Sequence, residues 1–294
     1  MNGLILMDKP QGFTSFKAAA VIRRIYSEKR MGHTGTLDPL ATGVLPVLLG
    51  RATRLCSYCL EADKRYTANV RLGVTTDTLD ITGEILTECE PNVSDEELLA
   101  AIGNFLGEYD QLPPMFSAIK KDGVRLYDLA RQGLQVERKT RRVNIKEINL
   151  LERRGNDFVI DVLCSKGTYI RSLCDDIGRF LGCGAVMTQL RRTKTAQFLI
   201  GECVTVEQLE NDPDSCLLSP ERVVEYLRCV DYAETQGNRF MHGALIDAKR
   251  IKFFDDVKDG ELFRVRCNKK FLGLAEYIEA ENSLKTKCVV ADEL

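Results

Sequence analysis

The sixteen residues from Met31 to Pro46, MGHTGTLDPLATGVLP, constrain the fold of this chain more than any other stretch. They hold one carboxylate, Asp38, in an otherwise uncharged run. Pro39 directs Asp38 toward an extended or turn conformation, and three glycines permit backbone angles that are closed to other residues: Gly32, Gly35 and Gly43. The apolar run from Val44 to Leu49 predicts a short buried strand. The pattern therefore predicts a shaped loop anchored on a rigid element, which is a common way to present a reactive group.

Asp38 is open to two interpretations. Asp followed by Pro is ordinary turn chemistry, so the carboxylate would merely cap a turn. The run GHTGTLDPLATGVL, however, resembles the catalytic-loop motif of the TruB-type tRNA pseudouridine synthases of bacteria, with fourteen residues in the same order. This resemblance implies that Asp38 is the catalytic nucleophile and that His33 lies on the RNA-facing side of the same loop.

About two domains are expected, because 294 residues exceed what one hydrophobic core usually organises. The start of the chain does not read as a targeting leader, and no apolar run is long enough to span a bilayer, so we expect a soluble cytoplasmic protein. Eleven cysteines, odd in number and scattered in spacing, indicate reduced thiols rather than a disulfide framework. Cys56 and Cys59 form a CxxC pair far from both histidines, so we expect buried thiols and no metal site.

The net charge of −2 conceals a strong alternation along the chain. Residues 1–60 carry eight Lys and Arg against three Asp and Glu, and residues 117–195 carry seventeen against nine. The segment between them is acidic, with three against twelve. If the two basic segments meet in space, they form a surface for a polyanion such as RNA; otherwise the charges are ordinary solvated faces.

The N-terminal residues predict a strand followed by a helix. A strand from Leu4 to Met7 leads through a glycine turn into a helix from Phe16 to about Ser27, capped by Thr14 or Ser15. The apolar face of this helix is expected to contain Phe16, Ala20, Val21, Ile25 and the intervening alanines.

The segment KRYTANVRL, from Lys64 to Leu72, alternates in polarity and predicts a strand with Tyr66 on its inward face. An aromatic residue at such a position is usually part of the packed core. The KRYTA segment nevertheless resembles the family motif whose tyrosine stacks on the target base, which implies a base-binding and catalytic role for Tyr66. The acidic run that follows, with Asp77 and Asp80, also matches a family segment, and we assign it no chemistry.

Three further elements are expected in the middle of the chain. A capping box predicts a helix from Ser94 to about Phe105, and a second helix is expected from about Val124 to Gln132. Arg138 to Glu152 alternates as a basic strand, with a change of phase after Lys146 that indicates a bulge. Two cations of this strand are expected to contact the RNA backbone: Arg141 and Arg142.

The block from Asp157 to Thr193 begins with a predicted strand, DFVIDVLCS, that runs into a helix near Thr168. Arg171 lies at the start of this helix and off its apolar stripe. A cation there opposes the helix dipole, so we expect a carboxylate partner, and Asp38 is our candidate. The GTYIRSL motif resembles the family segment whose arginine pairs with the catalytic aspartate and whose tyrosine contacts the base. The resemblance thus implies roles for Arg171 and Tyr169.

The segment MTQLRRTKTAQF resembles the family's LRRT segment. This implies that Leu190 lines the base pocket and that three cations contact the RNA backbone: Arg191, Arg192 and Lys194. Ala196 stands where the family usually has glycine, which leaves the geometry of the following turn open. From Arg228 onward, short strands and turns predict a small β-rich domain whose placement resembles the PUA-like module of bacterial family members.

These features predict an α+β fold with a central mixed β-sheet, in which residues 1–227 form a pseudouridine synthase catalytic domain and residues 228–294 a small PUA-like domain. The resemblance implies that a flipped-out uridine at position 55, in the T-arm loop of tRNA, is isomerised without a cofactor. tRNA is then the partner, with no obligatory protein partner and a monomeric enzyme. Whether Asp38 attacks the base, attacks the ribose or acts first as a base is left open.

Three other functions are compatible with parts of the sequence. A non-catalytic RNA-binding or tRNA-folding protein would use the same basic surface, and a guide-RNA-dependent pseudouridine synthase would share the motifs. The acidic insert and the minimal C-terminal domain favour a stand-alone enzyme. A phosphate-binding P-loop at GHTGT is excluded because the Gly-Lys-Ser or Gly-Lys-Thr triplet is missing.

Overall fold

The computed structural model describes residues 1–121, 123–134, 136–251 and 256–294. Its main body is a mixed sheet of nine strands: β1 (Gly3–Lys9), β2 (Met31–His33), β3 (Thr42–Leu49), β4 (Lys64–Leu72), β7 (Gly107–Gln111), β10 (Arg141–Arg154), β11 (Asp157–Cys164), β12 (Ala185–Thr195) and β13 (Phe198–Leu199). The order is β1-β3-β12-β4-β11-β10-β7, with β2 paired to β3 and β13 to β12. Strands far apart in sequence therefore become neighbours, which brings residues near 40, 66 and 190 together.

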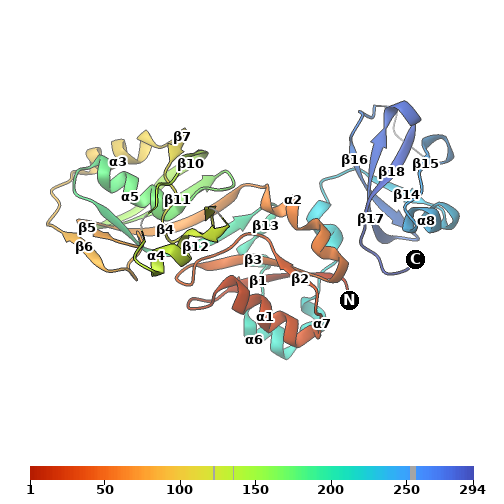
Figure 1. Ribbon diagram of the computed structural model, residues 1–294, viewed down its shortest axis with the longest axis horizontal. Helices are drawn as coiled ribbons and strands as arrows, with labels where there is room; N and C mark the ends of the chain where they lie inside the picture. Colours follow the sequence, from red (N-terminus) through yellow and green to blue (C-terminus); the bar gives the residue numbers. More distant parts are fainter. Residues whose placement is uncertain (122, 135, 252–255) are drawn as a thin grey trace.

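A second sheet forms the C-terminal end of the elongated molecule (Figure 1). Its order is β14-β16-β17-β18-β15, from β14 (Cys229–Tyr232), β15 (Ile246–Asp247), β16 (Leu262–Cys267), β17 (Lys270–Ile278) and β18 (Ser283–Val289), and α8 (Glu234–Met241) packs beside it. The predicted α+β fold with a central mixed sheet and a small β-rich C-terminal domain is thus confirmed. The predicted boundary between residues 227 and 228 lies just before β14 and stays a prediction.

Helices cover the large sheet at its two ends. α1 (Ser15–Tyr26), α6 (Val206–Asn211) and α7 (Pro213–Cys216) lie against β1, whereas α3 (Asp95–Asn104) and α5 (Ile170–Phe180) lie near β10, β11 and β12 (Figure 1). Each group encloses its own apolar cluster. The cluster beside α5 contains Tyr66 and Leu190, so the predicted site lies at this end of the sheet.

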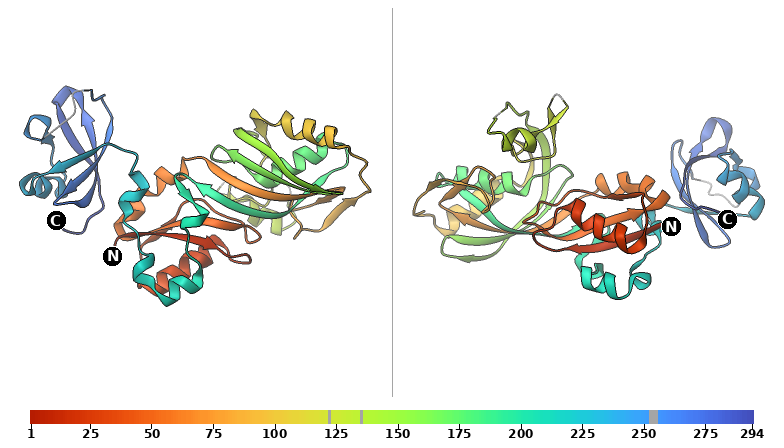
Figure 2. Two further views of the ribbon diagram at one scale, coloured as in Figure 1. Left: turned by 180° about the vertical axis from the view of Figure 1, so that it is seen from behind. Right: turned by 60° about the horizontal axis from the view of Figure 1, so that its bottom comes forward.

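Most of the predicted elements are present. β4 buries Tyr66 and every second residue after it, and the capping box at Ser94 opens α3. The register of β10 with β11 shifts between Ile145 and Glu147, which confirms the bulge. The helix predicted at 124–132 is shorter, because β9 (Val124–Arg125) pairs with β8 (Lys120–Lys121) before α4 (Leu126–Arg131) begins. Figure 2 shows this segment standing out from the large sheet in its right-hand view.

The predicted apolar face of the first helix is confirmed in part: Ala18 and Ala19 are buried and Ile25 packs against the cluster under α1, whereas Phe16 is exposed. Thr14 caps α1 by accepting a hydrogen bond from Lys17 N, as predicted, but the buried residues are Ser15, Ala18, Ala19 and Ile22. Ser15 turns inward because its hydroxyl forms two hydrogen bonds with the backbone of Leu37. Phe16, the next residue, therefore points outward and is 70% exposed.

The remaining short elements connect the sheets. β5 (Val74–Thr76) and β6 (Ile85–Glu88) form a hairpin, and η1 (Gly50–Leu55) and α2 (Cys56–Leu60) follow β3. Two 3₁₀ helices lie between the large sheet and β14 in the sequence: η2 (Ile200–Glu202) and η3 (Pro220–Val224). Two more belong to the C-terminal unit: η4 (Ala248–Arg250) and η5 (Glu279–Glu281).

Candidate active site

The loop that carries Asp38 is fixed from several sides. Ser15 Oγ accepts from Leu37 N at 2.8 Å and donates to Leu37 O at 3.2 Å, and Gly12 N donates to Pro39 O at 2.8 Å. Both residues that flank Asp38 are therefore tied to the start of α1. Gly43 has a φ of 106°, and a Cβ there would lie 2.2 Å from the backbone oxygen of Arg192. Glycine is required at this position by both conformation and space.

Arg171 is the partner of Asp38. It is the second residue of α5 and only 4% exposed, and its Nη2 lies 2.9 Å from Asp38 Oδ2. The same guanidinium donates to Thr78 O at 2.9 Å and to Phe116 O at 2.8 Å. The predicted ion pair is present, and its arginine is held in place by two backbone carbonyls.

Asp80 is a member of the site that the sequence did not reveal. It is 5% exposed, and its Oδ2 lies 3.8 Å from Arg171 Nη1. Its Oδ1 accepts from Thr78 Oγ1 and from Thr82 N, each at 3.0 Å. The acidic turn was visible in the sequence, but nothing there shows that this turn meets α5.

Burial and the neighbouring cations shift the pKa of Asp38 in opposite directions. Burial raises the pKa of its carboxyl, and Asp80 raises it further, whereas Arg171 and Lys9 lower it. Lys9 is fully buried, and burial lowers its pKa to about 8. The side chain of Asp38 keeps 36% of its surface exposed, so a substrate can reach the carboxylate.

The residues predicted to receive the base lie on neighbouring elements. Tyr66 on β4 and Leu190 on β12 are 9% and 8% exposed and share one apolar cluster with Leu37. Tyr169 is the half-buried residue before α5. Burial raises the pKa of both tyrosines, and the charge of Asp38 acts on both in the same direction. The two rings therefore lie in the electrostatic range of the carboxylate.

His33 ends β2 with its Nδ1 buried and without a hydrogen-bond partner. Burial lowers the pKa of this imidazole, and the nearby Arg192 lowers it further. A neutral, half-buried ring beside the loop is suited to a contact with a substrate through its exposed part, not through the buried Nδ1.

The prediction that Arg192 contacts the RNA backbone is wrong. Arg192 is 1% exposed, and it donates from Nε to Val44 O at 2.7 Å and from Nη2 to Gly35 O at 3.2 Å. Side chains alternate along a strand, so Arg192 shares the inward face of β12 with Leu190 while Arg191 faces outward. The alternation places Arg191 and Arg192 on opposite faces, and the contacts with Val44 and Gly35 decide that the face of Arg192 is inside.

The other predicted cations remain accessible. Arg191 pairs with Asp8 at 2.7 Å and keeps 43% of its side chain exposed, and Lys194 is half-buried. At the start of β10, Arg142 pairs with Glu108 and Asp110, whereas Arg141 is exposed and lowers the pKa of Tyr169. Of the two cations at the start of β10, Arg141 is thus the one that acts on a residue of the site.

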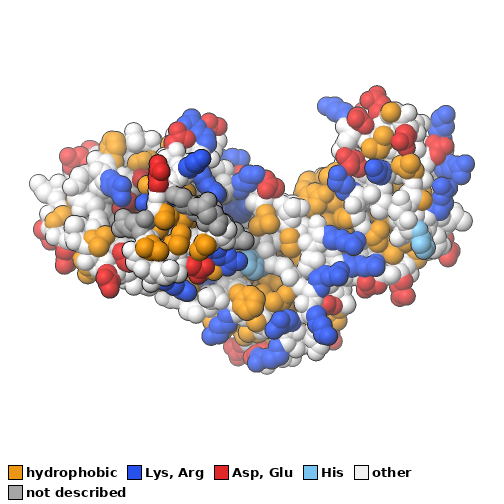
Figure 3. All heavy atoms as spheres, in the orientation of Figure 1, with side chains coloured by type: hydrophobic (Ala, Val, Ile, Leu, Met, Phe, Trp, Pro, Cys, Tyr) orange, Lys and Arg blue, Asp and Glu red, His pale blue; other side chains and the backbone are white. Residues whose placement is uncertain are grey.

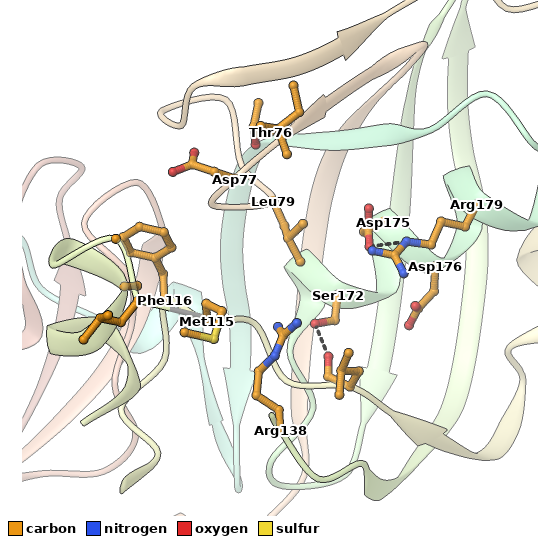
Figure 4. Close-up of a pocket in the computed structure, with 15 residues that line it drawn as sticks. Thr76, Asp77, Leu79, Met115, Phe116, Arg138, Ser172, Asp175, Asp176 and Arg179 are labelled. Carbon is orange, nitrogen blue, oxygen red and sulfur yellow. Dashed lines mark hydrogen bonds and ion pairs between the residues drawn. The ribbon is translucent and has the colours of Figure 1, made fainter. Parts of the chain in front are cut away.

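A cavity of about 370 Å³ is lined by Leu79, Phe116 and Ser172 (Figure 4). Asp175, Asp176 and Arg179 of α5 also line it. Burial, followed by the charge of Asp175, raises the pKa of Asp176 to about 6. The cavity thus borders the segments that position Arg171.

The described ranges contain no cluster of three or more His, Cys, Asp or Glu side chains that could hold a metal ion. In the same part of the chain, no helix is long and apolar enough to cross a membrane. The site contains the carboxylates of Asp38 and Asp80, the buried cations Arg171 and Lys9, and apolar or aromatic walls.

Comparison with known proteins gives consistent results. Residues 23–170 match the N-terminal domain of the TruB family pseudouridylate synthases, and residues 171–230 match the tRNA pseudouridylate synthase B C-terminal domain. The chain is 42% identical to tRNA pseudouridine synthase B of Clostridium perfringens, covering 94% of this chain and 95% of that protein. The corresponding protein of Clostridioides difficile is 41% identical, with 98% of each chain covered.

The fold is also shared with a solved structure. A chain in the structure of an H/ACA RNP bound to a substrate RNA containing 2'-deoxyuridine matches with a TM-score of 0.74 at 26% identity. The match covers 98% of this chain and 85% of that chain. From the family matches, the near full-length relatives and the site geometry together, we conclude that this chain belongs to the TruB family of pseudouridylate synthases.

Proposed function

We propose that this enzyme isomerises the uridine at position 55 in the T-arm loop of tRNA, with Asp38 as its nucleophile. The observation that carries the proposal is the ion pair between Asp38 and Arg171, whose guanidinium is buried and held by two backbone carbonyls. Relatives named tRNA pseudouridine synthase B at 41–42% identity over nearly the whole chain support tRNA as the substrate.

The geometry suits the chemistry of this isomerisation. The reaction breaks the bond between ribose C1' and uracil N1 and rejoins the ring through C5; C5 loses a proton and N1 gains one, so there is no net oxidation or hydrolysis. In its anionic form, which the charge of Arg171 favours, the carboxylate can add to C6 of the ring, add to C1', or remove a proton first. The three routes share one requirement, which is an anionic Asp38 within reach of the base.

The target base must leave the helical stack to reach Asp38, which costs a few kcal/mol in enzymes of this kind. Tyr66, Tyr169 and Leu190 form a largely apolar surface beside the carboxylate, where a flipped pyrimidine would lie. His33, half-buried at the end of β2, would contact the RNA at the vacated position. The accessible cations would meet phosphates: Arg141, Arg142, Arg191 and Lys194.

The test is pseudouridine formation on an unmodified tRNA transcript, read by mass-tagging at each uridine. The wild-type enzyme should modify the T-arm loop, and Asp38→Asn should abolish turnover while the Kd for tRNA stays within a few-fold, because an amide keeps the shape but is a far poorer nucleophile. Asp157→Asn, which alters a surface carboxylate paired with Arg71, serves as the matched control and should keep full activity.

Three results would overturn the proposal. Near-wild-type turnover by Asp38→Asn would remove Asp38 from the chemistry. Modification only after a guide RNA is added would make the enzyme guide-dependent. Tight tRNA binding without any pseudouridine would make it a binding or folding protein.

A further inference from the structure

The outer face of α1 lies beside the catalytic loop and takes no part in the site described above. α1 carries Lys17, Arg23 and Arg24 and no acidic residue. Phe16, at its first turn, has the largest exposed fraction among the large hydrophobic side chains in the described ranges. Figure 3 shows hydrophobic and cationic side chains together over the region of α1.

Internal packing does not account for the position of Phe16. The neighbouring Phe13 is covered by Lys17, whose Nζ lies 4.1 Å from the ring centroid, and it packs against the apolar cluster under α1. Arg24 is bound by Glu210 at 2.9 Å. No ring contact within the described ranges involves Phe16. This leaves Phe16 and Arg23, seven residues apart, as exposed groups of one helix face, with the exposed Lys17 on the adjoining face.

The same face is rigidly connected to the nucleophile. Ser15, the residue before Phe16, forms both hydrogen bonds with Leu37, and Gly12 binds Pro39, so the start of α1 and the Asp38 loop form one unit. A group bound by Phe16 would therefore be held at a fixed position relative to Asp38. Single exposed hydrophobic residues are common on protein surfaces, but this ring is tied to a reactive loop and flanked by cations.

We propose that Phe16 is a substrate-positioning residue whose ring stacks on an unpaired loop nucleotide of the RNA next to the flipped uridine. Lys17 and Arg23 face the phosphates of that nucleotide and its neighbours. An aromatic ring between cations is the combination that binds single-stranded nucleic acid, because bases stack on the ring and phosphates meet the charges. This inference rests on the proposed RNA substrate.

The first experiment compares Phe16→Ala with Phe16→Trp on the T-arm stem-loop. The alanine variant should raise both Kd and KM about 10-fold, leave kcat at saturating RNA unchanged, and leave the slope of log Kd against log salt unchanged, because stacking releases no counterions. Phe16→Trp should restore binding. Lys17→Gln should instead reduce the slope of log Kd against log salt by about the amount that one phosphate contact contributes.

Matched controls separate this effect from general surface changes. Leu106→Ala removes a side chain that is 58% exposed beyond α3, and Arg154→Gln removes an exposed cation at the β10–β11 hairpin. Both should bind RNA as the wild type does. Thermal unfolding of Phe16→Ala should match the wild type, since the ring buries little surface.

The second experiment replaces single loop nucleotides by abasic residues. At the nucleotide that Phe16 contacts, the wild type should lose about 10-fold in affinity, whereas Phe16→Ala should lose nothing further. Wild-type Kd and KM in Phe16→Ala, or a loss that tryptophan does not restore, would overturn the inference. A wild-type enzyme that binds the stem-loop but forms no pseudouridine would overturn the proposed function instead, and the binding comparison would still test Phe16.

Discussion

At the scale of single residues, the ionisation of Asp38 is set by neighbours from distant parts of the chain. Burial raises the pKa of this carboxyl, while Arg171 lowers it and Asp80 raises it. The anion is the reactive form, so each neighbour should move the acid limb of the pH-rate profile in a predictable direction.

Removing Arg171 should shift that limb upward. Arg171→Met takes away the charge that lowers the pKa of Asp38, so the anion is lost at a higher pH and the rate at neutral pH falls strongly. Arg171→Lys should restore part of the charge effect but not the three hydrogen-bonded contacts of the guanidinium. Single-turnover rates measured from pH 5 to 9 check this. A methionine variant with the wild-type profile would show that Arg171 does not control Asp38.

Asp80→Asn should shift the limb in the opposite direction. The amide keeps the oxygen that accepts from Thr78 and Thr82 but removes a like charge near Asp38, so the pKa of Asp38 falls and the acid limb moves to lower pH. Asp77→Asn, exposed in the same turn, is the control and should leave the profile unchanged. A shift of the same sign as that of Arg171→Met would contradict this account.

At the scale of elements, the turn between β12 and β13 carries a strained residue. Ala196 adopts a φ of 52°, in the left-handed region that favours glycine. The alanine therefore keeps the turn that the family forms with glycine, at an energetic cost.

Ala196→Gly should raise the free energy of unfolding by about 0.5–1 kcal/mol, because the Cβ that opposes this φ is removed. The same change at Ala100, exposed in the middle of α3, should lower it by about 1 kcal/mol. Urea unfolding of both variants measures whether each change raises or lowers the free energy of unfolding. Destabilisation at both positions would mean that the strain at Ala196 is relieved by its packing.

At the scale of the whole molecule, the C-terminal unit is joined to the rest through a shared core and an ionic cluster. Phe271, Leu274 and Val290 belong to the same apolar cluster as Leu4. Beside it, the carboxylate of Glu221, 8% exposed, accepts from Arg264 at 2.8 Å and from Arg266 at 2.7 Å.

Glu221→Gln should lower the free energy of unfolding by roughly 2 kcal/mol, because two guanidinium groups lose their buried counter-charge. Glu202→Gln removes a half-exposed partner of Arg222 and should cost less than about 1 kcal/mol. Denaturant unfolding compares the variants, and limited proteolysis should release the C-terminal unit more readily from Glu221→Gln. Equal losses of unfolding free energy in both variants would show that the Glu221 cluster contributes no more than a half-exposed ion pair.

The sequence by itself determined the local structure. The strand containing Tyr66, the capping box at Ser94, the bulge after Ile145 and the loop around Asp38 follow from periodicity, capping and glycine placement, which act over a few residues. The partner of Asp38 was also predictable, since a cation at the start of α5 requires a counter-charge.

Only the tertiary structure decided what surrounds that pair. Asp80 and the carbonyl of Phe116 reach Arg171 because separate segments converge on the start of α5. Arg192 is buried, and Phe16 is exposed, because their neighbours in space fixed which way the strand and the helix face. Sequence patterns reveal that an element has two faces, but the contacts between elements decide which face is inside, since burial depends on the partners that satisfy each polar group.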